Sequence, residues 1–407
     1  MTKQGLRAVA WCVVGCTAAM CVAEVETRVI DGQPSWLIRT PDVELAVTHL
    51  GGHMAPVTFC RGSARPVQPY YISSWQGKGL AMPVPVLVPL RGDFFCLPFG
   101  ANGVAFEGRQ FPPHGETAGA EWKLASATTT DDVTTLTLEL AGRIVPGTVT
   151  KHLSLVQGQN VVYCRHVIAG FSGAMPLGHH ASLRMPAKEG AMRVAVSPFK
   201  LGMTCPVLFS NPANREYQSF AIGAAFTDLR RVPLLWKEPS EADATRYPAR
   251  PGFTDLLAVF SVAPRQEPAW VAASVPEEGY LWFALKDPAV LPSTVFWIQN
   301  GGRHGHPWNG GERCLGLEDV CGFFAEGIAA SVSANGVRAR GIPTCVPLNP
   351  DRPTTVNYVQ GVARIPGDFG EVLDVTFAPG AVTFRSANGR SVTVPVRHEF
   401  LRTGALR

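Results

Sequence analysis

Short runs in which apolar and polar residues alternate dominate this sequence, and a period of two is typical of β-strands with one buried face. The pattern is clear at residues 43–47, 134–140 and 152–168, the last being broken at Gly158-Gln159. No segment combines sustained helical spacing with a cap at both ends, and no repeat recurs at a fixed period. We therefore expect an all-β protein built from antiparallel sheets.

The C-terminal part of the chain carries strong turn signals. Residues 372–396 hold three β-rich runs separated by Pro379-Gly380 and Asn388-Gly389, and Asn-Gly is the strongest short hairpin signal. This predicts a meander of three strands. Because no long polar linker divides the chain, we expect residues 24–407 to form a single sandwich domain.

The first 23 residues resemble a secretory signal peptide. Lys3 and Arg7 precede an uncharged apolar run that ends before Glu24, and small residues make cleavage after Ala23 favourable. The run is shorter than the roughly 20 residues that span a bilayer, so we expect export to the periplasm or the medium without a membrane span in the mature chain. Lipoprotein anchoring at Cys16 is the less favoured alternative.

Charge and cysteine content disfavour a nucleic-acid partner and a structural zinc site. The formal net charge of +4 falls to +2 once Lys3 and Arg7 are removed, and no basic cluster stands out, which disfavours nucleic acid. Seven of the ten cysteines follow the leader, so at least one thiol stays unpaired. None of their spacings is CxxC, which disfavours a zinc knuckle.

Three stretches look unlike scaffold. The first joins Arg91 to the loop PPHGETAGAEW, in which two prolines stiffen the chain just before His114, with Glu116 and a tryptophan behind it. The second is LGHHASLRMP at residues 177–186. The third is WIQNGGRHGHPWNGGERCLGLEDV, at residues 297–320.

The third stretch has the composition of a sugar site, because aromatic faces stack on pyranose rings while Arg, Asn and His donate to hydroxyls. The alternative is a glycine-rich loop that packs two tryptophans into the core. The candidate ligands in this stretch are Trp297, Asn300, Arg303, His306, Trp308 and Asn309.

Taken together, these stretches resemble the aldose 1-epimerase (galactose mutarotase) superfamily. The similarity rests on VELAVTHLGGHMAPVTF at residues 43–59, on the segment from Arg91 to HGE at His114, on the histidine-containing strand, and on GLED ending at Asp319. The order Arg, His, His, Glu covers most of the mature chain. The Asn-His-Thr-Tyr-Phe type of stretch found in better-known members is absent, which indicates a divergent branch.

The resemblance implies a β-supersandwich with a sugar or oligosaccharide ligand and no cofactor. By position, Glu318 takes the proton of the anomeric hydroxyl and His180 protonates the ring oxygen as the ring opens. His114, counted with the catalytic groups, and Arg91 hold that oxygen and a neighbouring hydroxyl. His179 and Glu116 are further candidates for sugar contact.

Strand alternation separates the two adjacent histidines. His179 shares a face with Ala181, Leu183 and Met185, which look like core, whereas His180 lies on the other face. This favours His180 as the acid.

Other functions compete with an epimerase. A non-catalytic carbohydrate-binding protein needs no acid and base, and a glycoside hydrolase would use Glu116 and Glu318 as its carboxyl pair. A metal held by His304, His306 and Glu318 is disfavoured, because flanking glycines and Pro307 make that segment a loop. We therefore expect no metal.

Overall fold

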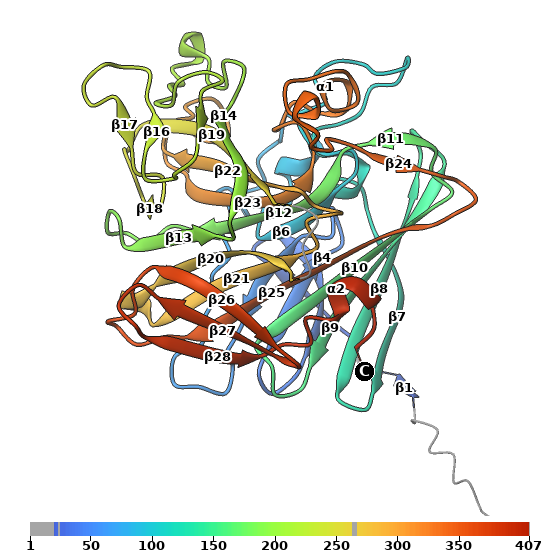
Figure 1. Ribbon diagram of the computed structural model, residues 1–407. Coiled ribbons are helices and arrows are strands. Elements are labelled where there is room, and N and C mark those ends of the chain that lie inside the picture. The colour runs from blue at the N-terminus through green and yellow to red at the C-terminus, as the bar shows by residue number, and fades with distance from the viewer. Residues whose placement is uncertain (1–19, 23–24, 263–266, 407) are drawn as a thin grey trace, which may run out of the picture.

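Two large antiparallel sheets face each other in the computed structural model, which describes residues 20–22, 25–262 and 267–406 (Figure 1). One of them, the inner sheet, has ten strands in the described residues. In order, these are β1 (Met20–Val22), β7 (Lys123–Thr130), β8 (Val133–Gly142), β9 (Gly147–Val156), β10 (Val161–Ala169), β25 (Thr354–Arg364), β21 (Tyr280–Lys286), β20 (Ala269–Val275), β13 (Met192–Val196) and β18 (Arg246–Tyr247).

The second, which we call the site sheet, has eleven strands among the described residues. Its order brings β12, β23 and β22 together in the middle, although they are far apart in sequence. The strands are β15 (Ala225–Phe226), β14 (Phe199–Thr204), β19 (Phe253–Ser261), β22 (Ser293–Asn300), β23 (Arg313–Cys321), β12 (Leu177–Arg184), β6 (Asp93–Cys96), β5 (Met54–Thr58), β4 (Glu44–Thr48), β3 (Gln33–Arg39) and β2 (Glu26–Ile30).

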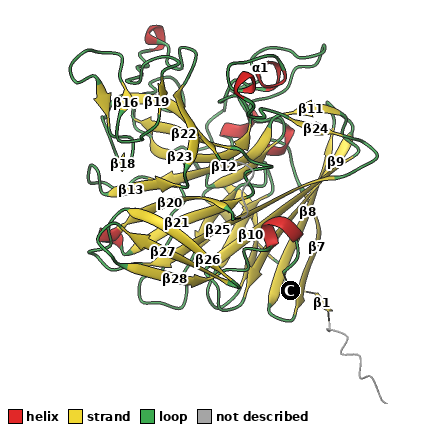
Figure 2. Cartoon of the chain, in the orientation of Figure 1, coloured by secondary structure: helices red, strands yellow, loops and turns green. Residues whose placement is uncertain are grey.

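Smaller elements complete the fold, and Figure 2 shows how little of it is helical. The small sheets are β11 (Gly173–Met175) with β24 (Val346–Leu348), β16 (Val232–Pro233) with β17 (Glu241–Ala242), and β26 (Val372–Ala378), β27 (Ala381–Ser386) and β28 (Ser391–Pro395). The helices are α1 (Ile328–Val332) and α2 (Phe400–Thr403), with 3-10 turns at Pro85–Leu87, Glu116–Ala118, Pro212–Asn214, Pro276–Glu278 and Arg338–Arg340.

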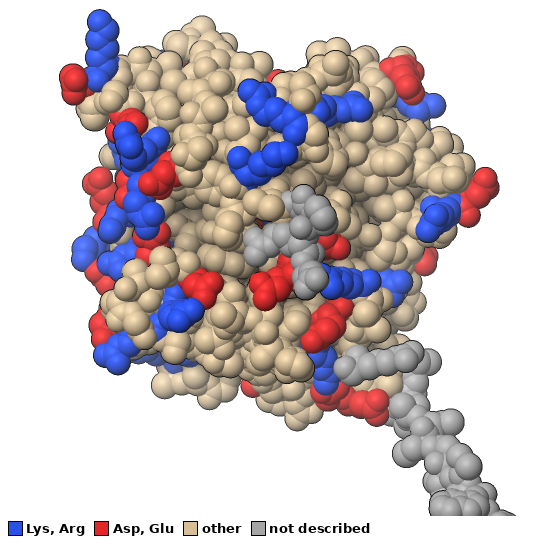
Figure 3. All heavy atoms as spheres, in the orientation of Figure 1, with Lys and Arg blue, Asp and Glu red and all other residues tan. Residues whose placement is uncertain are grey.

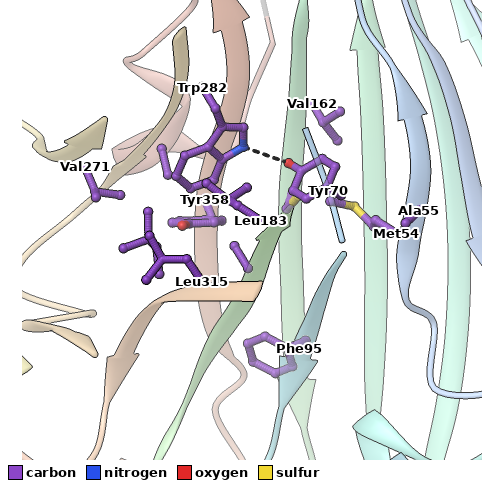
Figure 4. Close-up of a cluster of buried hydrophobic side chains, with 14 of the residues drawn as sticks. Met54, Ala55, Tyr70, Phe95, Val162, Leu183, Val271, Trp282, Leu315 and Tyr358 are labelled. Carbon is purple, nitrogen blue, oxygen red and sulfur yellow. Dashed lines mark hydrogen bonds between the residues drawn. The ribbon is translucent and has the colours of Figure 1, made fainter. Parts of the chain in front are cut away.

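Three apolar layers hold these elements together. The largest lies between the two big sheets, where Trp282 of β21 donates to the hydroxyl of Tyr70 at 3.2 Å (Figure 4). A second covers the outer face of the site sheet, and a third packs the β26–β28 meander and α2 against the inner sheet. The middle strands of each large sheet are therefore covered on both faces, which explains why strands such as β23 are buried almost throughout.

The fold confirms the all-β antiparallel class predicted from the sequence. The predicted C-terminal meander is present, with its turns at Pro379-Gly380 and Asn388-Gly389. All seven cysteines after the leader are free thiols, and only Cys345 among them is not buried. The single-domain boundary at residue 24 stays a prediction.

The predicted leader falls largely outside the described residues. Met20–Val22 pair with β7, and the predicted cleavage site after Ala23 is not described. Among the residues that are described, no helix is both long and apolar enough to cross a membrane. On the face shown in Figure 3, basic side chains lie among acidic ones.

Candidate active site

The register of β12 and β23 creates two pairs of polar residues on opposite faces of the site sheet. His180 stands directly opposite Glu318, and His179 stands opposite Asp319. Because successive side chains of a strand point to opposite faces, one pair faces the inner sheet and the other faces outwards. His180 and Glu318 form the outward pair, and both line a pocket.

This pocket, of about 410 Å³, lies on the outer face of the site sheet. Its size is typical of a small-molecule site. In Figure 1 the segment with β16–β18 and the segment with α1 rise on either side of this face. The floor includes Phe94, His180, Leu256, Trp297 and Glu318. The walls come from Val84, Val86, Leu87, Leu90, Pro113, His114, Val207, Leu208, Phe209, Arg303, Trp308, Ala325 and Glu326.

His180 and Glu318 are in direct contact. The Nε2 atom of His180 lies 3.1 Å from Oε1 of Glu318, and the hydroxyl of Ser182 lies 3.3 Å from His180 Nδ1. Phe94 stacks on the His180 ring at 4.5 Å between centroids. The second carboxyl oxygen of Glu318 is buried and has no hydrogen-bond partner in the described part of the chain. One buried acceptor is therefore left for a ligand.

Glycine at position 316 makes room for this carboxyl group. Gly316 is two residues before Glu318 and thus on the same face of β23. A Cβ atom there would lie 2.8 Å from Glu318 Oε1 and 3.0 Å from the Cβ of Trp297. A side chain at this position would therefore displace the floor of the pocket.

His114 reaches the same pocket from the proline-rich loop. Its φ of 60° is in the left-handed region, and its backbone N–H donates to Gly100 O at 2.7 Å. The carbonyl of Pro112 accepts from Gly115 N at 2.9 Å, which closes the turn. The His114 ring then lies edge-on to the His180 ring, with centroids 4.9 Å apart. The stiff sequence before His114 is thus a shaped loop that brings a third polar side chain to the pair.

Burial decides the charge state of these groups. It raises the pKa of Glu318 well above its usual value, and the positive charge of Arg303 opposes that rise. Burial also lowers the pKa of His180 well below its usual range, helped by His114 and His53. The pKa of His114 falls to about 4, again mainly through burial. The contact pair of His180 and Glu318 therefore favours states with no net charge.

Aromatic rings surround the one cation of the pocket. The guanidinium of Arg303 lies 5.2 Å from the ring centroid of Trp308, 5.4 Å from Phe209 and 5.6 Å from Trp297. Trp297 and Trp308 meet edge to face, with centroids 5.7 Å apart. The sequence placed these two tryptophans and Arg303 at the ligand site, and the structure brings them into the pocket with His180, Glu318 and His114.

Arg91 was expected beside these groups, and this expectation is wrong. Its side chain is fully buried and points away from the pocket. The guanidinium donates hydrogen bonds to five oxygen atoms. These are the carbonyls of Pro89, Ile30, Ala55 and Asp31, at 3.1 to 3.5 Å, and Oε1 of Gln76 at 2.8 Å. Arg91 is a structural cation.

His179 and Glu116 also lie outside the pocket. His179 faces the inner sheet, where its Nδ1 is 2.9 Å from Oδ2 of Asp93. The carboxylate of Glu116 accepts the backbone N–H groups of Arg143 and Ile144, at 3.0 Å each, and so anchors a turn. Neither residue lines the pocket, so Glu116 does not face Glu318 across it as a hydrolase pair would.

Three further residues that were predicted to contact the sugar lie in the 301–312 loop or next to it, outside the pocket. Asn300 is buried and donates to Ala249 O, His306 contacts Ala81 O at 2.8 Å, and Asn309 is exposed in a left-handed turn. None of them lines the pocket. His306 therefore does not join His304 and Glu318 around a metal.

The described residues contain one group of side chains with metal-ligand geometry. Asp93, Cys164 and His179 each offer an atom, and these atoms lie within 4.8 Å of one another. All three are buried between the large sheets. Because Oδ2 of Asp93 already accepts from His179 and from Gln360 Nε2 at 2.9 Å, the group is explained as part of a buried polar layer.

Sequence reasoning missed several residues of the pocket. Ser182, which contacts His180, shares the outward face of β12 with it and could have been found by alternation, whereas Phe94 lines the pocket from the neighbouring strand β6, opposite His180. Phe209 and Glu326 carried no signal, because they lie in loops whose folding depends on the rest of the molecule.

Comparison with known proteins gives the fold a name. No family model and no curated protein matches the sequence. A galactose mutarotase-like protein from Clostridium acetobutylicum superposes with a TM-score of 0.57 at 11% identity, covering 84% of this chain and 99% of that one. The chain has the galactose mutarotase-like fold.

Two further solved structures agree. A galactose mutarotase related enzyme from Lactobacillus acidophilus has a TM-score of 0.51 at 12% identity, covering 82% of this chain and 98% of that one. A protein from Escherichia coli K12, described as a candidate aldose 1-epimerase, has a TM-score of 0.52 at 14% identity, covering 81% and 99%. The galactose mutarotase-like fold is thus shared at very low sequence identity.

Proposed function

We propose that this protein is an exported aldose 1-epimerase-like enzyme that interconverts the anomers of a sugar. The observation that carries the proposal is the contact between His180 and Glu318 on the floor of an aromatic-lined pocket. An acid and a base that act on one anomeric centre must lie close together, because the ring oxygen and the anomeric hydroxyl are bonded to the same carbon. The shared fold supports this assignment.

Ring opening uses the charged form of the pair. The Glu318 carboxylate takes the proton of the anomeric hydroxyl, the C–O bond to the ring oxygen breaks, and protonated His180 gives its Nε2 proton to that oxygen. The pair is left uncharged, as burial favours. Arg303 stabilises the Glu318 carboxylate at the start of this step.

Ring closure reverses the transfers after rotation about the bond next to the aldehyde carbon. The hydroxyl that was the ring oxygen attacks the other face of the carbonyl and returns its proton to His180. Protonated Glu318 gives its proton to the carbonyl oxygen. The pair regains its starting state, so no cofactor and no outside proton is consumed.

His114 has a positioning role. Its low pKa keeps it neutral near pH 7, so one ring nitrogen can donate to the sugar while the other accepts. Cys96 Sγ lies 3.6 Å from His114 Nδ1, and this contact helps to hold the ring edge-on to His180.

Anomer exchange is the direct test. Polarimetry or exchange NMR on a panel of aldoses should show faster interconversion with the wild-type protein than without it. Glu318→Gln should abolish the acceleration while keeping the binding of sugar, because glutamine retains the shape but cannot take the proton. Binding without acceleration by the wild type would identify a non-catalytic carbohydrate-binding protein instead.

A further inference from the structure

Arg303, which is partly buried, differs from the fully buried Arg91 near the site sheet. Arg91 donates hydrogen bonds to five oxygen atoms. Arg303 forms no side-chain hydrogen bond and no ion pair within 4.0 Å in the part of the chain that the structure describes. Its guanidinium lines the pocket, held only by the rings of Trp297, Trp308 and Phe209. Three aromatic faces attract the cation but accept none of its N–H groups in ordinary hydrogen bonds.

The backbone around Arg303 fixes the position of this group. The Arg303 carbonyl accepts from Gly310 N at 2.8 Å, and Gly301 N donates to Glu312 O at 2.9 Å. Gly302 packs so tightly that a Cβ there would lie 2.2 Å from the backbone of Phe253. The loop therefore presents one side chain at a defined place, which is the condition for selective binding.

The surroundings of Arg303 favour an anion from outside the chain. Most of the pocket lining is apolar, with Val86, Leu87 and Leu256 among it, so this partly buried cation has lost part of its water without gaining a polar partner in the described chain. Glu318 and Glu216 act on its charge only through space. A planar guanidinium with free N–H groups matches the two oxygens of a carboxylate or phosphate.

We propose that Arg303 binds an anionic group of the substrate, so that this site acts on acidic sugars, hexuronates or hexose phosphates, in preference to neutral aldoses. The inference rests on the proposed function, because it takes the pocket to be a sugar site. In such sugars the charged group is carried by the carbon next to the ring oxygen or by one bonded to it. The guanidinium of Arg303 lies 5.6 Å from the centroid of the Trp297 ring, and that ring meets the His180 ring edge to face with centroids 5.6 Å apart, so Arg303 lies on the reacting side of the pocket.

Matched sugar pairs test the proposal. Exchange NMR compares glucuronate with glucose, galacturonate with galactose, and glucose 6-phosphate with glucose. We expect kcat/KM at least about tenfold higher for the acidic member of a pair, the scale of one charge-assisted contact. The uronate and phosphate arms show which anion is preferred.

Arg303→Met removes the charge and keeps much of the apolar stem. We expect it to lower kcat/KM for acidic sugars by about tenfold or more and to change that for neutral sugars less than about threefold. Arg109→Met, which removes an exposed charge outside the pocket, is the control for net charge and should leave both values unchanged. Thermal unfolding of all variants shows whether the fold is kept, and Arg303→Lys replaces Arg303→Met if the latter does not fold.

The outcomes separate the two proposals. The role of Arg303 is overturned if the wild type exchanges neutral sugars as well as acidic ones or better. It is also overturned if Arg303→Met loses kcat/KM equally for both classes of sugar. In either case the proposed epimerase activity stands. If no sugar exchanges, calorimetry decides: glucuronate binding that is lost in Arg303→Met supports an acidic-sugar binding site without catalysis. Equal binding of glucuronate and glucose would overturn the proposal.

Discussion

The two faces of β12 and β23 carry the same chemistry with opposite outcomes. Each face has one histidine opposite one carboxylate, His179 with Asp319 inside and His180 with Glu318 outside. The difference lies in how many partners each carboxylate has. Inside, the protein supplies them all, and outside it leaves room for another molecule.

On the inner face, each oxygen of the Asp319 carboxylate has a hydrogen-bond donor. Both oxygens of Asp319 are used, since Oδ1 accepts from Lys286 Nζ at 2.5 Å and from Thr294 at 2.6 Å, and Oδ2 accepts from Tyr358 at 2.7 Å. The His179 ring stacks on Tyr358, with centroids 4.2 Å apart. The fold alone therefore satisfies the Asp319 carboxylate, although Nε2 of His179 and Oδ1 of Asp93 on the same face are buried without a partner in the described residues.

The outer face is an open one. Glu318 has a single contact through Oε1, and its second oxygen lacks a partner within the described chain. Polar groups that are buried without partners are rare in native proteins, and they cluster where a ligand completes them. The comparison teaches that the two carboxylates differ in their partners: both oxygens of Asp319 have donors, whereas Oε2 of Glu318, in the pocket, has none within the described chain.

The largest effect should follow from Glu318→Gln. We expect anomer exchange to slow by on the order of 10² to 10⁴, because the base of the reaction is lost. The unfolding free energy should change by less than about 1 kcal/mol, since the amide fills the same space and a raised pKa already marks the carboxylate as costly to bury. Exchange NMR and chemical denaturation measure the two quantities. A stable variant with wild-type exchange would remove Glu318 from the mechanism.

The inner carboxylate should give the opposite result. Asp319→Asn leaves Lys286 buried without its counter-ion, so we expect a loss of about 3–5 kcal/mol of unfolding free energy in urea denaturation. Exchange per folded molecule should fall far less than in Glu318→Gln. The double variant Asp319→Leu with Lys286→Met should regain stability, because it removes both charges. A stable but inactive Asp319→Asn variant would contradict the structural role assigned to the inner carboxylate.

Loss of His114 should have a smaller effect. We expect His114→Ala to weaken sugar binding or exchange by on the order of tenfold or more, with little change of stability, because the ring positions the ligand while the turn is closed by backbone bonds. His306→Ala is the matched control, since His306 is exposed and outside the pocket. Equal rates for the two variants in polarimetry would return the proline-rich loop to a purely structural role.

The contrast also shows what the sequence could and could not predict. Alternation put His179 on the core face and His180 on the other face, and the structure has the same arrangement, because the side-chain period of a strand is fixed by its backbone. It could not show that Arg91 turns towards backbone carbonyls, since these come from residues 30 and 55 and meet it only after folding. The 301–312 loop was harder still. Its composition indicated a sugar site, but which side chains point inwards depends on backbone turns without a period, so Arg303 and Trp308 reached the pocket while Asn309 did not.

The smallest effect concerns pH and tests whether the outer pair is as buried as the structure shows. The working pair shares one proton. A second proton makes it cationic, which burial and the neighbouring His114 oppose, so the acid limb of kcat/KM should lie below 6.5, the usual pKa of histidine. Loss of the shared proton makes it anionic, which burial opposes, so the alkaline limb lies well above the usual value of glutamate, 4.5.

Arg303 should move both limbs in the same direction. Its positive charge disfavours a second proton and favours loss of the shared one, so Arg303→Met should shift the acid and alkaline limbs of the profile to higher pH. The acid limb of the wild type could instead lie at 6.5 and stay there in Arg303→Met. His180 would then titrate as a solvated histidine, and the His180 and Glu318 pair would not be buried as described above.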